Sequence, residues 1–230
     1  MTRKIRLGAF LPGGGQHIAS WRHPDQPADG AVSLDFHVRL AREAERGLFD
    51  AYFLADGLAT GGTSEGGPAR IAGFEPVTLF AALATQTTHL GFIATASTTY
   101  EEPYNTARKF ASLDLISGGR LQLGISRGSP EQVVDGWRYF GYQPAEGESD
   151  QDMARRHTEV FLQQLEGKGF ARPNPRPMFP NPPGLLRLEP HSEGLRDRIW
   201  WGSASDATAE WAARMGMNLQ SSTLKVDESG

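Results

Sequence analysis

The amino-acid sequence predicts an α/β protein built on a parallel sheet. Short apolar runs typical of strands alternate with segments of helical period, and this alternation repeats five times along the chain. The long loops follow the strands rather than the helices, as they do when crossover helices connect parallel strands. The predicted strands cover residues 5–11, 50–56, 90–96, 120–126 and 199–201, and residues 218–221 are suited to begin a sixth.

Capping residues mark the ends of the predicted helices. Ser33 or Asp35 is suited to cap the first helix, and Pro76 lies in the first turn of the second. Gly118 and Gly119 end the third helix, because glycine accepts the left-handed conformation that follows many helices. The predicted helices cover residues 36–48, 75–86, 103–117, 133–139, 150–164 and 206–215.

Composition narrows the class of protein. The 230 residues suffice for a single α/β domain over 1–230, and 39% apolar with 22% charged residues is typical of a globular chain. A net charge of −4 gives no electrostatic reason to expect a nucleic acid or a membrane surface as partner. There are no cysteines, and the six histidines lack a ligand spacing, so no metal site is predicted. Without a signal peptide or an apolar run of about 20 residues, a cytoplasmic protein is expected.

The segment after the fifth predicted strand is suited to bind an anion. Ser203, Ser205 or Asp206 is placed to cap the helix that follows. Several backbone N–H groups and two hydroxyls would then point at one spot, with the positive end of the helix dipole behind them. Residues alone leave two interpretations open here, a phosphate-binding turn and an ordinary strand-to-helix turn.

The candidate functional residues all follow strands. Asp56, residues 95–99, Arg127 and Ser205 would share the catalytic face of a (β/α)8 barrel. A doubly wound open sheet is the alternative, although no Gly-x-Gly-x-x-Gly pattern follows the first strand. A barrel of this type needs eight strands and only about six are visible. The chain therefore lacks two βα units or is a shortened variant with a covered edge.

Residues 167–198 interrupt the alternation of strands and helices. Seven prolines lie between residues 173 and 190, and such a stretch can form neither a helix nor a central strand. A domain linker is one interpretation. Because the strand pattern resumes at Ile199, we expect an ordered excursion over the barrel mouth, the end at which the strands finish.

Five segments carry a resemblance to a known family. They are HIASWRHP at 17–24, AERGLFDAYFLAD at 44–56, TASTTY at 95–100 with the following PY and AR pairs, SGGR through GISRG at 117–128, and SDATAEWAARMG at 205–216. In order and spacing they resemble the bacterial luciferase-like flavin-dependent monooxygenases, in particular the nitrilotriacetate and dibenzothiophene-sulfone monooxygenase group. The resemblance implies a (β/α)8 TIM barrel, here truncated after about six strands.

The resemblance also implies an activity. Reduced FMN, supplied by a separate NAD(P)H-dependent reductase, would react with O2 to give a peroxyflavin that transfers one oxygen atom to a small organic substrate. A homodimer is expected. Two alternatives stay open: an F420-dependent oxidoreductase that transfers hydride on the same fold, and a non-catalytic flavin-binding protein.

Site residues follow from the same resemblance. It assigns cofactor contacts to Asp56, Ala94, Thr95, Ser97, Thr98, Arg127, Ser205 and Thr208, and catalytic roles to His17 and Asp56. Ser205 and Thr208 would hold the FMN phosphate. The peptide bond between Ala94 and Thr95 would be cis, as it is in the superfamily.

One pair of residues departs from the family pattern. Glu148 and Asp152 stand where the nitrilotriacetate group has a histidine and a tyrosine that contact FMN. Two carboxylates near a phosphate would repel it. Of the remaining histidines, His37 and His89 are expected at the surface.

Overall fold

Six parallel strands form one sheet in the computed structural model, which describes residues 5–17, 19–56, 73–99, 101–126, 142–203 and 205–221. The strands lie in chain order, and each is hydrogen-bonded to the next. They are β1 (Gly8–Phe10), β2 (Ala51–Leu54), β3 (Gly91–Ser97), β4 (Leu121–Ser126), β5 (Ile199–Ser203) and β6 (Asn218–Ser221). The predicted parallel sheet and its sixth strand are confirmed.

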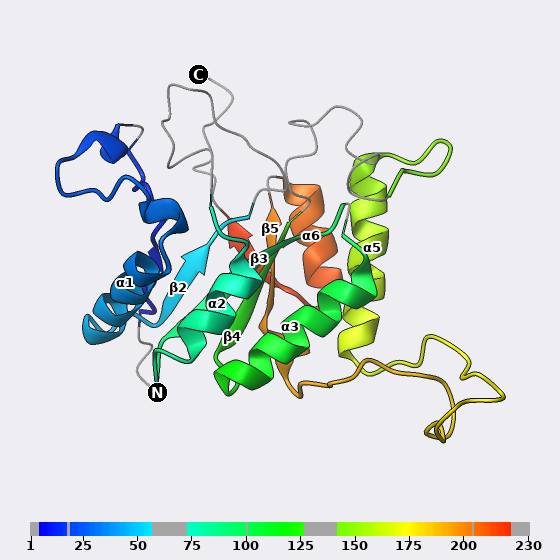
Figure 1. The fold of residues 1–230 in the computed structure, drawn as a ribbon. Helices are drawn as coiled ribbons and strands as arrows, with labels where there is room; N and C mark the ends of the chain where they lie inside the picture. The colour runs from blue at the N-terminus through cyan, green and yellow to red at the C-terminus, as the bar shows by residue number, and fades with distance from the viewer. Residues whose placement is uncertain are drawn as a thin grey trace.

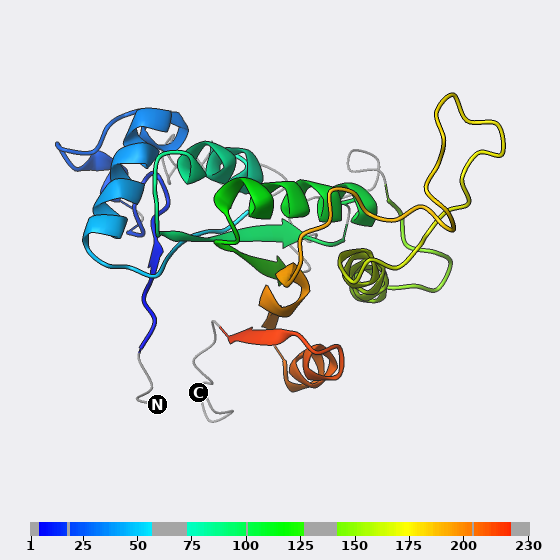
Figure 2. The same ribbon diagram turned by 90° about the horizontal axis from the view of Figure 1, so that it is seen from below.

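The helices cover one face of this curved sheet (Figures 1 and 2). They are α1 (Leu34–Arg46), α2 (Pro76–Ala84), α3 (Pro103–Ser117), α5 (Asp150–Leu165) and α6 (Asp206–Arg214), with 3-10 turns η1 (Ser20–Arg22), η2 (Gly30–Val32) and η6 (Leu195–Arg198). A doubly wound sheet carries helices on both faces, so this arrangement is part of a (β/α)8 barrel. The helix predicted at 133–139 lies outside the described residues.

The helices begin at polar caps. Ser33 accepts a hydrogen bond from the Phe36 amide, which decides between the two caps predicted for α1. Glu75 and Glu102 cap α2 and α3, each followed by a proline at the first helical position. At the other end of α3, Gly118 takes φ 67°, the left-handed conformation expected of it.

The strands present alternate residues to two environments. On the outer face, Phe92 of β3 packs against Phe80 of α2 with ring centroids 5.0 Å apart, inside the main core. On the inner face, the tilted rings of Phe10 and Phe53, from the first two strands, pack with centroids 4.8 Å apart, in register with Ile93. Phe10 is 41% exposed, so the inner face is partly open to solvent.

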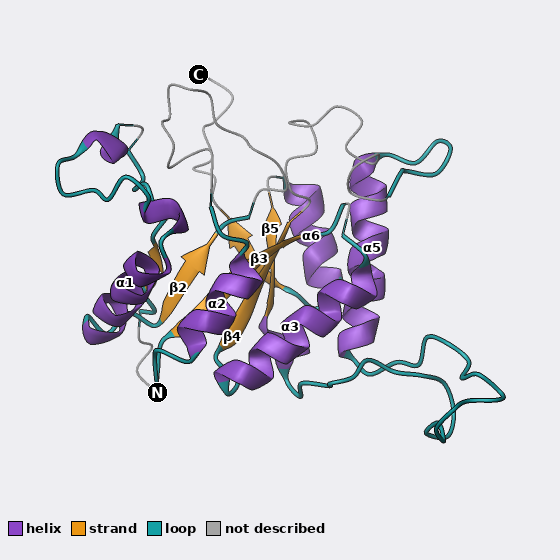
Figure 3. Cartoon of the chain, in the orientation of Figure 1, coloured by secondary structure: helices purple, strands orange, loops and turns teal. Residues whose placement is uncertain are grey.

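Residues 167–198, the proline-rich segment, lie where the strands begin, because they connect the end of α5 to the start of β5 (Figures 1 and 3). An antiparallel bridge between Ala171 and Leu186 closes its base. The prediction that this segment passes over the barrel mouth is therefore wrong. Connections that run from a helix to a strand reach the amino ends of the strands, opposite the mouth.

A buried ion pair stabilises this amino edge. The Asp114 carboxylate, in α3, lies 2.8 and 2.9 Å from two guanidinium nitrogens of Arg198. It also accepts hydrogen bonds from the Ser192 hydroxyl and the Leu121 amide. Arg198 in turn donates to the carbonyl groups of Gly119 and Leu121. These contacts connect α3, β4 and η6.

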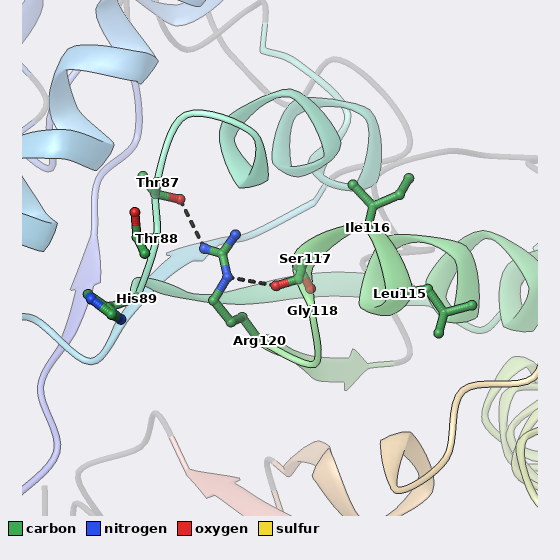
Figure 4. A pocket seen from close by; sticks show the side chains of 8 residues that line it. All are labelled: Thr87, Thr88, His89, Leu115, Ile116, Ser117, Gly118 and Arg120. Carbon is green, nitrogen blue, oxygen red and sulfur yellow. Dashed lines mark hydrogen bonds between the residues drawn. The ribbon is translucent and has the colours of Figure 1, made fainter.

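Arg120 has a similar role at the same edge (Figure 4). Its guanidinium donates to the carbonyl oxygens of Ala84, Leu90 and Ser117 and to the Thr87 hydroxyl, at 2.7–3.0 Å. A shallow, open hollow of about 540 Å³ surrounds it, lined by Thr87, Thr88, His89, Leu115, Ile116, Ser117, Gly118 and Arg120. Because backbone carbonyls already bind this arginine at the amino edge, the SGGR segment has a structural role.

We predict that Asp114→Ala destabilises the fold by about 3–5 kcal/mol, because the substitution leaves a partly buried guanidinium without its carboxylate. Urea unfolding measures this change. The matched control is Glu43→Ala, which removes the exposed pair with Arg46 and should leave stability nearly unchanged. Equal effects of the two substitutions would contradict the assigned role of Asp114.

Candidate functional site

The carboxyl edge of the sheet collects most of the predicted site residues. Asp56 follows β2, Ser97 ends β3 and is followed by Thr98 and Thr99, and Ser203 ends β5. Parallel strands finish at the same edge, which is the upper edge in Figure 1. Arg127, also predicted here, lies outside the described residues.

Three hydroxyls cluster where β5 turns into α6. The Thr208 hydroxyl lies 2.6 Å from that of Ser203 and 3.0 Å from that of Ser205. Ser205 is the N-cap and accepts a 3.4 Å hydrogen bond from the Thr208 amide, as predicted. Ser203 was considered only as a cap, although its place at the end of a strand was a usable signal for a site residue.

The first turn of α6 is suited to receive an anion. Within the described part of the chain, no hydrogen-bond acceptor is found for the amides of Asp206 and Ala207, which lie at the positive end of the helix dipole. Beside them stand the three clustered hydroxyls. The Asp206 carboxylate belongs to the same turn and is exposed, so its charge is screened by solvent.

The inner face near this edge is polar and has room beside a glycine. The Thr95 hydroxyl donates to the Leu54 carbonyl at 2.9 Å. A Cβ atom added to Gly124 would lie 3.6 Å from Gln220 Oε1 and 3.8 Å from Thr95 Oγ1. The missing side chain therefore leaves space between these two polar groups. Gln220 was not among the predicted site residues.

Ala94 does not face this space. Its side chain is fully buried in the core, on the face opposite Thr95. The expectation of a cis bond between Ala94 and Thr95 is wrong, since the one cis peptide bond within the described residues precedes Pro190. The two residues instead pair regularly with Leu123 and Gly124 of β4, which requires ordinary extended backbone.

The turn after β3 is buried and held by α5. Ser97, Thr98 and Thr99 all have buried side chains. The Thr98 carbonyl accepts a hydrogen bond from His157 Nδ1 at 2.9 Å, and the Thr98 hydroxyl lies 3.1 Å from that of Thr158. The resemblance placed Thr98 at the cofactor but gave no partner on α5.

His157 is a buried histidine that the sequence analysis did not single out. Burial lowers its pKa, and among the described residues Nε2 has no hydrogen-bond partner. The Tyr142 ring packs edge-on against it, with centroids 4.6 Å apart. The sequence did contain a signal for its burial, because Met153, His157 and Phe161 are spaced four residues apart and so lie on one face of α5.

His37 is also buried, contrary to the expectation of a surface position. Nδ1 lies 2.9 Å from the Tyr52 hydroxyl, which donates to the Leu11 carbonyl. Nε2 lies 3.3 Å from the Ala31 carbonyl. Burial lowers the His37 pKa. These contacts fix both ends of the loop between β1 and α1.

His17 lies within that loop and is exposed. Its Nδ1 accepts a hydrogen bond from the Ala19 amide at 3.1 Å. This contact is local to the loop and does not connect His17 to Asp56 or to the α6 hydroxyls. Its catalytic role remains a prediction.

Glu148 and Asp152 are paired with arginines. Arg156 binds Glu148 through two nitrogens at 2.9 Å, and this pairing lowers the Glu148 pKa to about 2. Asp152 pairs with Arg155 at 3.2 Å and accepts from the Ser149 hydroxyl. The predicted repulsion assumed two unpaired carboxylates. Their charges are compensated locally, so this objection to phosphate binding is weakened.

In the part of the chain that the structure describes, no three His, Asp or Glu side chains come together as ligands for a metal ion. No helix in the same part of the chain has the length and apolar character that crossing a membrane requires.

The fold is that of a parallel barrel, and the candidate site lies at the carboxyl ends of its strands. The chain belongs to the luciferase-like monooxygenase family, whose sequence profile matches residues 15–229. This agrees with the resemblance found in the sequence.

Individual relatives cover parts of the chain. It is 50% identical over 132 residues to N-acetyl-S-(2-succino)cysteine monooxygenase of Bacillus subtilis (strain 168), covering 57% of this chain and 30% of that protein. It is 39% identical over 131 residues to nitrilotriacetate monooxygenase component A of Aminobacter aminovorans, covering 52% and 28%. The structure of EDTA monooxygenase from Chelativorans sp. BNC1 matches with a TM-score of 0.70 and 24% identity, covering 94% of this chain and 53% of that one. The chain thus spans about half or less of the length of these relatives.

We predict that stability falls as the pH drops below about 6.5, the ordinary pKa of histidine. His37 and His157 have lowered pKa values in the fold, so below this pH the unfolded chain binds protons that the folded chain does not. Their contribution is complete above pH 6.5 and is lost toward the lower folded pKa. Urea unfolding between about pH 7.5 and 5.5 measures the slope.

A substitution identifies the source of that slope. His157→Asn should make the slope shallower than in the unsubstituted protein. An unchanged slope would rule out the assignment to this buried histidine.

Proposed function

We propose that this chain is the flavin-binding part of an FMNH2-dependent monooxygenase that transfers one oxygen atom from O2 to a small organic substrate. The hydroxyl cluster of Ser203, Ser205 and Thr208 at the start of α6 carries the proposal. The cluster lies at the carboxyl edge of the sheet, in a chain that belongs to the luciferase-like monooxygenase family. Relatives named as monooxygenases support the reaction class.

The residues present fit FMN in two places. The α6 turn offers hydroxyl and amide donors to a phosphate, which are the groups that bind phosphates at helix N-termini. On the inner face, Gly124 has no side chain that would keep a flat ring from approaching the backbone between the polar groups of Thr95 and Gln220. Bound reduced flavin would supply the electrons that activate O2.

The protein's own contribution is position and shielding. Ser203, Ser205 and Thr208 would hold the phosphate end. Phe10 and Phe53 line the inner face with apolar rings, which would limit water near the reacting centre. Asp56, at the same edge, is suited to orient the ring through its carboxylate, as the resemblance implies. Thr98 and Arg127 complete the proposed contacts.

A second protein is part of this proposal. One relative is named component A, which implies a further component in that system. By analogy, an NAD(P)H-dependent reductase would supply reduced flavin here. The homodimer and the cytoplasmic location belong to the same proposal, and size-exclusion chromatography with light scattering tests the dimer.

Titration with reduced FMN, oxidised FMN and F420 tests the function. Binding is followed anaerobically by fluorescence, and oxygen uptake is then compared with that of free reduced FMN. We expect preferential binding of reduced FMN and altered oxygen uptake. Preference for F420 without oxygen uptake would indicate hydride transfer, and binding without either activity would indicate a flavin carrier.

We predict that Ser205→Ala weakens binding of reduced FMN by about 1–2 kcal/mol, the scale of a hydrogen bond to a charged group. Loss of the cap itself should cost about 1 kcal/mol of stability. Ser33→Ala is the matched control, because it removes the cap of α1 in the same way. It should lower stability similarly and leave the dissociation constant unchanged. If Ser205→Ala and Ser33→Ala weakened binding equally, Ser205 would be a helix cap without a role in binding the flavin.

A further inference from the structure

Helix α5 contacts the end of β3 through two adjacent side chains. His157 Nδ1 lies 2.9 Å from the Thr98 carbonyl oxygen, and the Thr158 hydroxyl lies 3.1 Å from the Thr98 hydroxyl. One residue of the turn is therefore held through both its backbone and its side chain. All the groups in these contacts belong to buried residues, where solvent does not compete for the hydrogen bonds.

The helix that provides these contacts is itself fixed. The Thr158 hydroxyl lies 2.7 Å from the Ala154 carbonyl within α5. Met153, Phe161 and Leu162 of the same helix are fully buried. A displacement of the turn relative to α5 would leave a buried carbonyl without its donor, which is costly.

The hydrogen bond to Thr98 defines the chemical form of His157. A carbonyl oxygen only accepts, so the proton must be on Nδ1. In the neutral ring Nε2 then has no proton, and no residue in the described part of the chain donates a hydrogen bond to it. The groups facing the ring are Arg156, Glu148, Tyr142 and the carbonyls of Thr98 and Thr99. Arg156 and Glu148 pair with each other, so neither requires a charged histidine.

We propose that His157 and Thr158 are positioning residues, which hold the 97–99 turn where the flavin ring requires it. This inference rests on the proposed function, because the turn is part of the flavin contact there. His157 acts through Thr98 and does not itself touch the cofactor. The essential feature is a donor at the Nδ1 position, and a donor at the Nε2 position would not replace it.

Replacing His157 by each of two amide side chains distinguishes the roles of its two ring nitrogens. The asparagine amide nitrogen occupies about the place of Nδ1, and the glutamine amide nitrogen that of Nε2. We expect His157→Asn to keep the dissociation constant of reduced FMN within about twofold. His157→Gln and Thr158→Val should each weaken it about three- to tenfold, the effect of one lost hydrogen bond. Both should also shift the absorption band of bound oxidised FMN.

Controls separate positioning from folding. Ser149→Ala removes the cap of α5 without touching the turn, and should lower the melting temperature while leaving flavin affinity and the absorption band unchanged. Equal affinities for His157→Asn and His157→Gln would overturn the proposal, as would affinity losses that simply follow the melting temperatures of all variants. If the unsubstituted chain binds no flavin, the proposed function fails, and this inference fails with it.

A measurement without flavin tests the structural premise. Nitrogen and carbon chemical shifts of the His157 ring distinguish the two neutral tautomers. The proton is expected on Nδ1 at neutral pH. A proton on Nε2 would overturn the inference even if flavin binding and oxygen uptake were as proposed.

Discussion

Because all six strands run in the same direction, each helix must begin near the carboxyl edge of the sheet and end near its amino edge. A helix start exposes N–H groups and a helix end exposes carbonyl groups. The two edges therefore differ chemically before any particular side chain is considered. One edge is rich in backbone donors and the other in backbone acceptors.

The side chains at each edge complement this difference. At the amino edge, Arg120 and Arg198 bind backbone carbonyls, and Arg196 donates to the carbonyl of Met215. At the carboxyl edge the caps differ among helices. Glu75 and Glu102 bring negative charge to α2 and α3, whereas α6 begins with a neutral serine among other hydroxyls. An anionic ligand would therefore meet less repulsion from the cap at α6 than at those two helices.

The sequence was sufficient for the sheet, the approximate extent of the described helices and the α6 turn, because local patterns determine them. It was insufficient where contacts join distant segments. The Glu148–Arg156 pair spans a loop and two turns of helix, so residue types suggested repulsion where the fold provides compensation. His37 and His157 look like ordinary polar positions until Tyr52 and Thr98 are brought beside them. The proline-rich segment connects a helix to a strand, so it must reach the amino edge of the sheet. The predicted direction of the strands was enough to infer this.

The same segment offers a place to modify the protein. Its base is closed by reciprocal backbone hydrogen bonds, from the Phe170 amide to the Leu186 carbonyl and from the Leu186 amide to the Ala171 carbonyl, at 2.9 and 2.8 Å. Beyond them the chain extends into solvent, and Met178 and Phe179 are 90% and 75% exposed. Because the two arms are already joined at the base, a short turn or an inserted reporter domain could replace the tip. Such a graft would project from the edge opposite the hydroxyl cluster, leaving that cluster accessible.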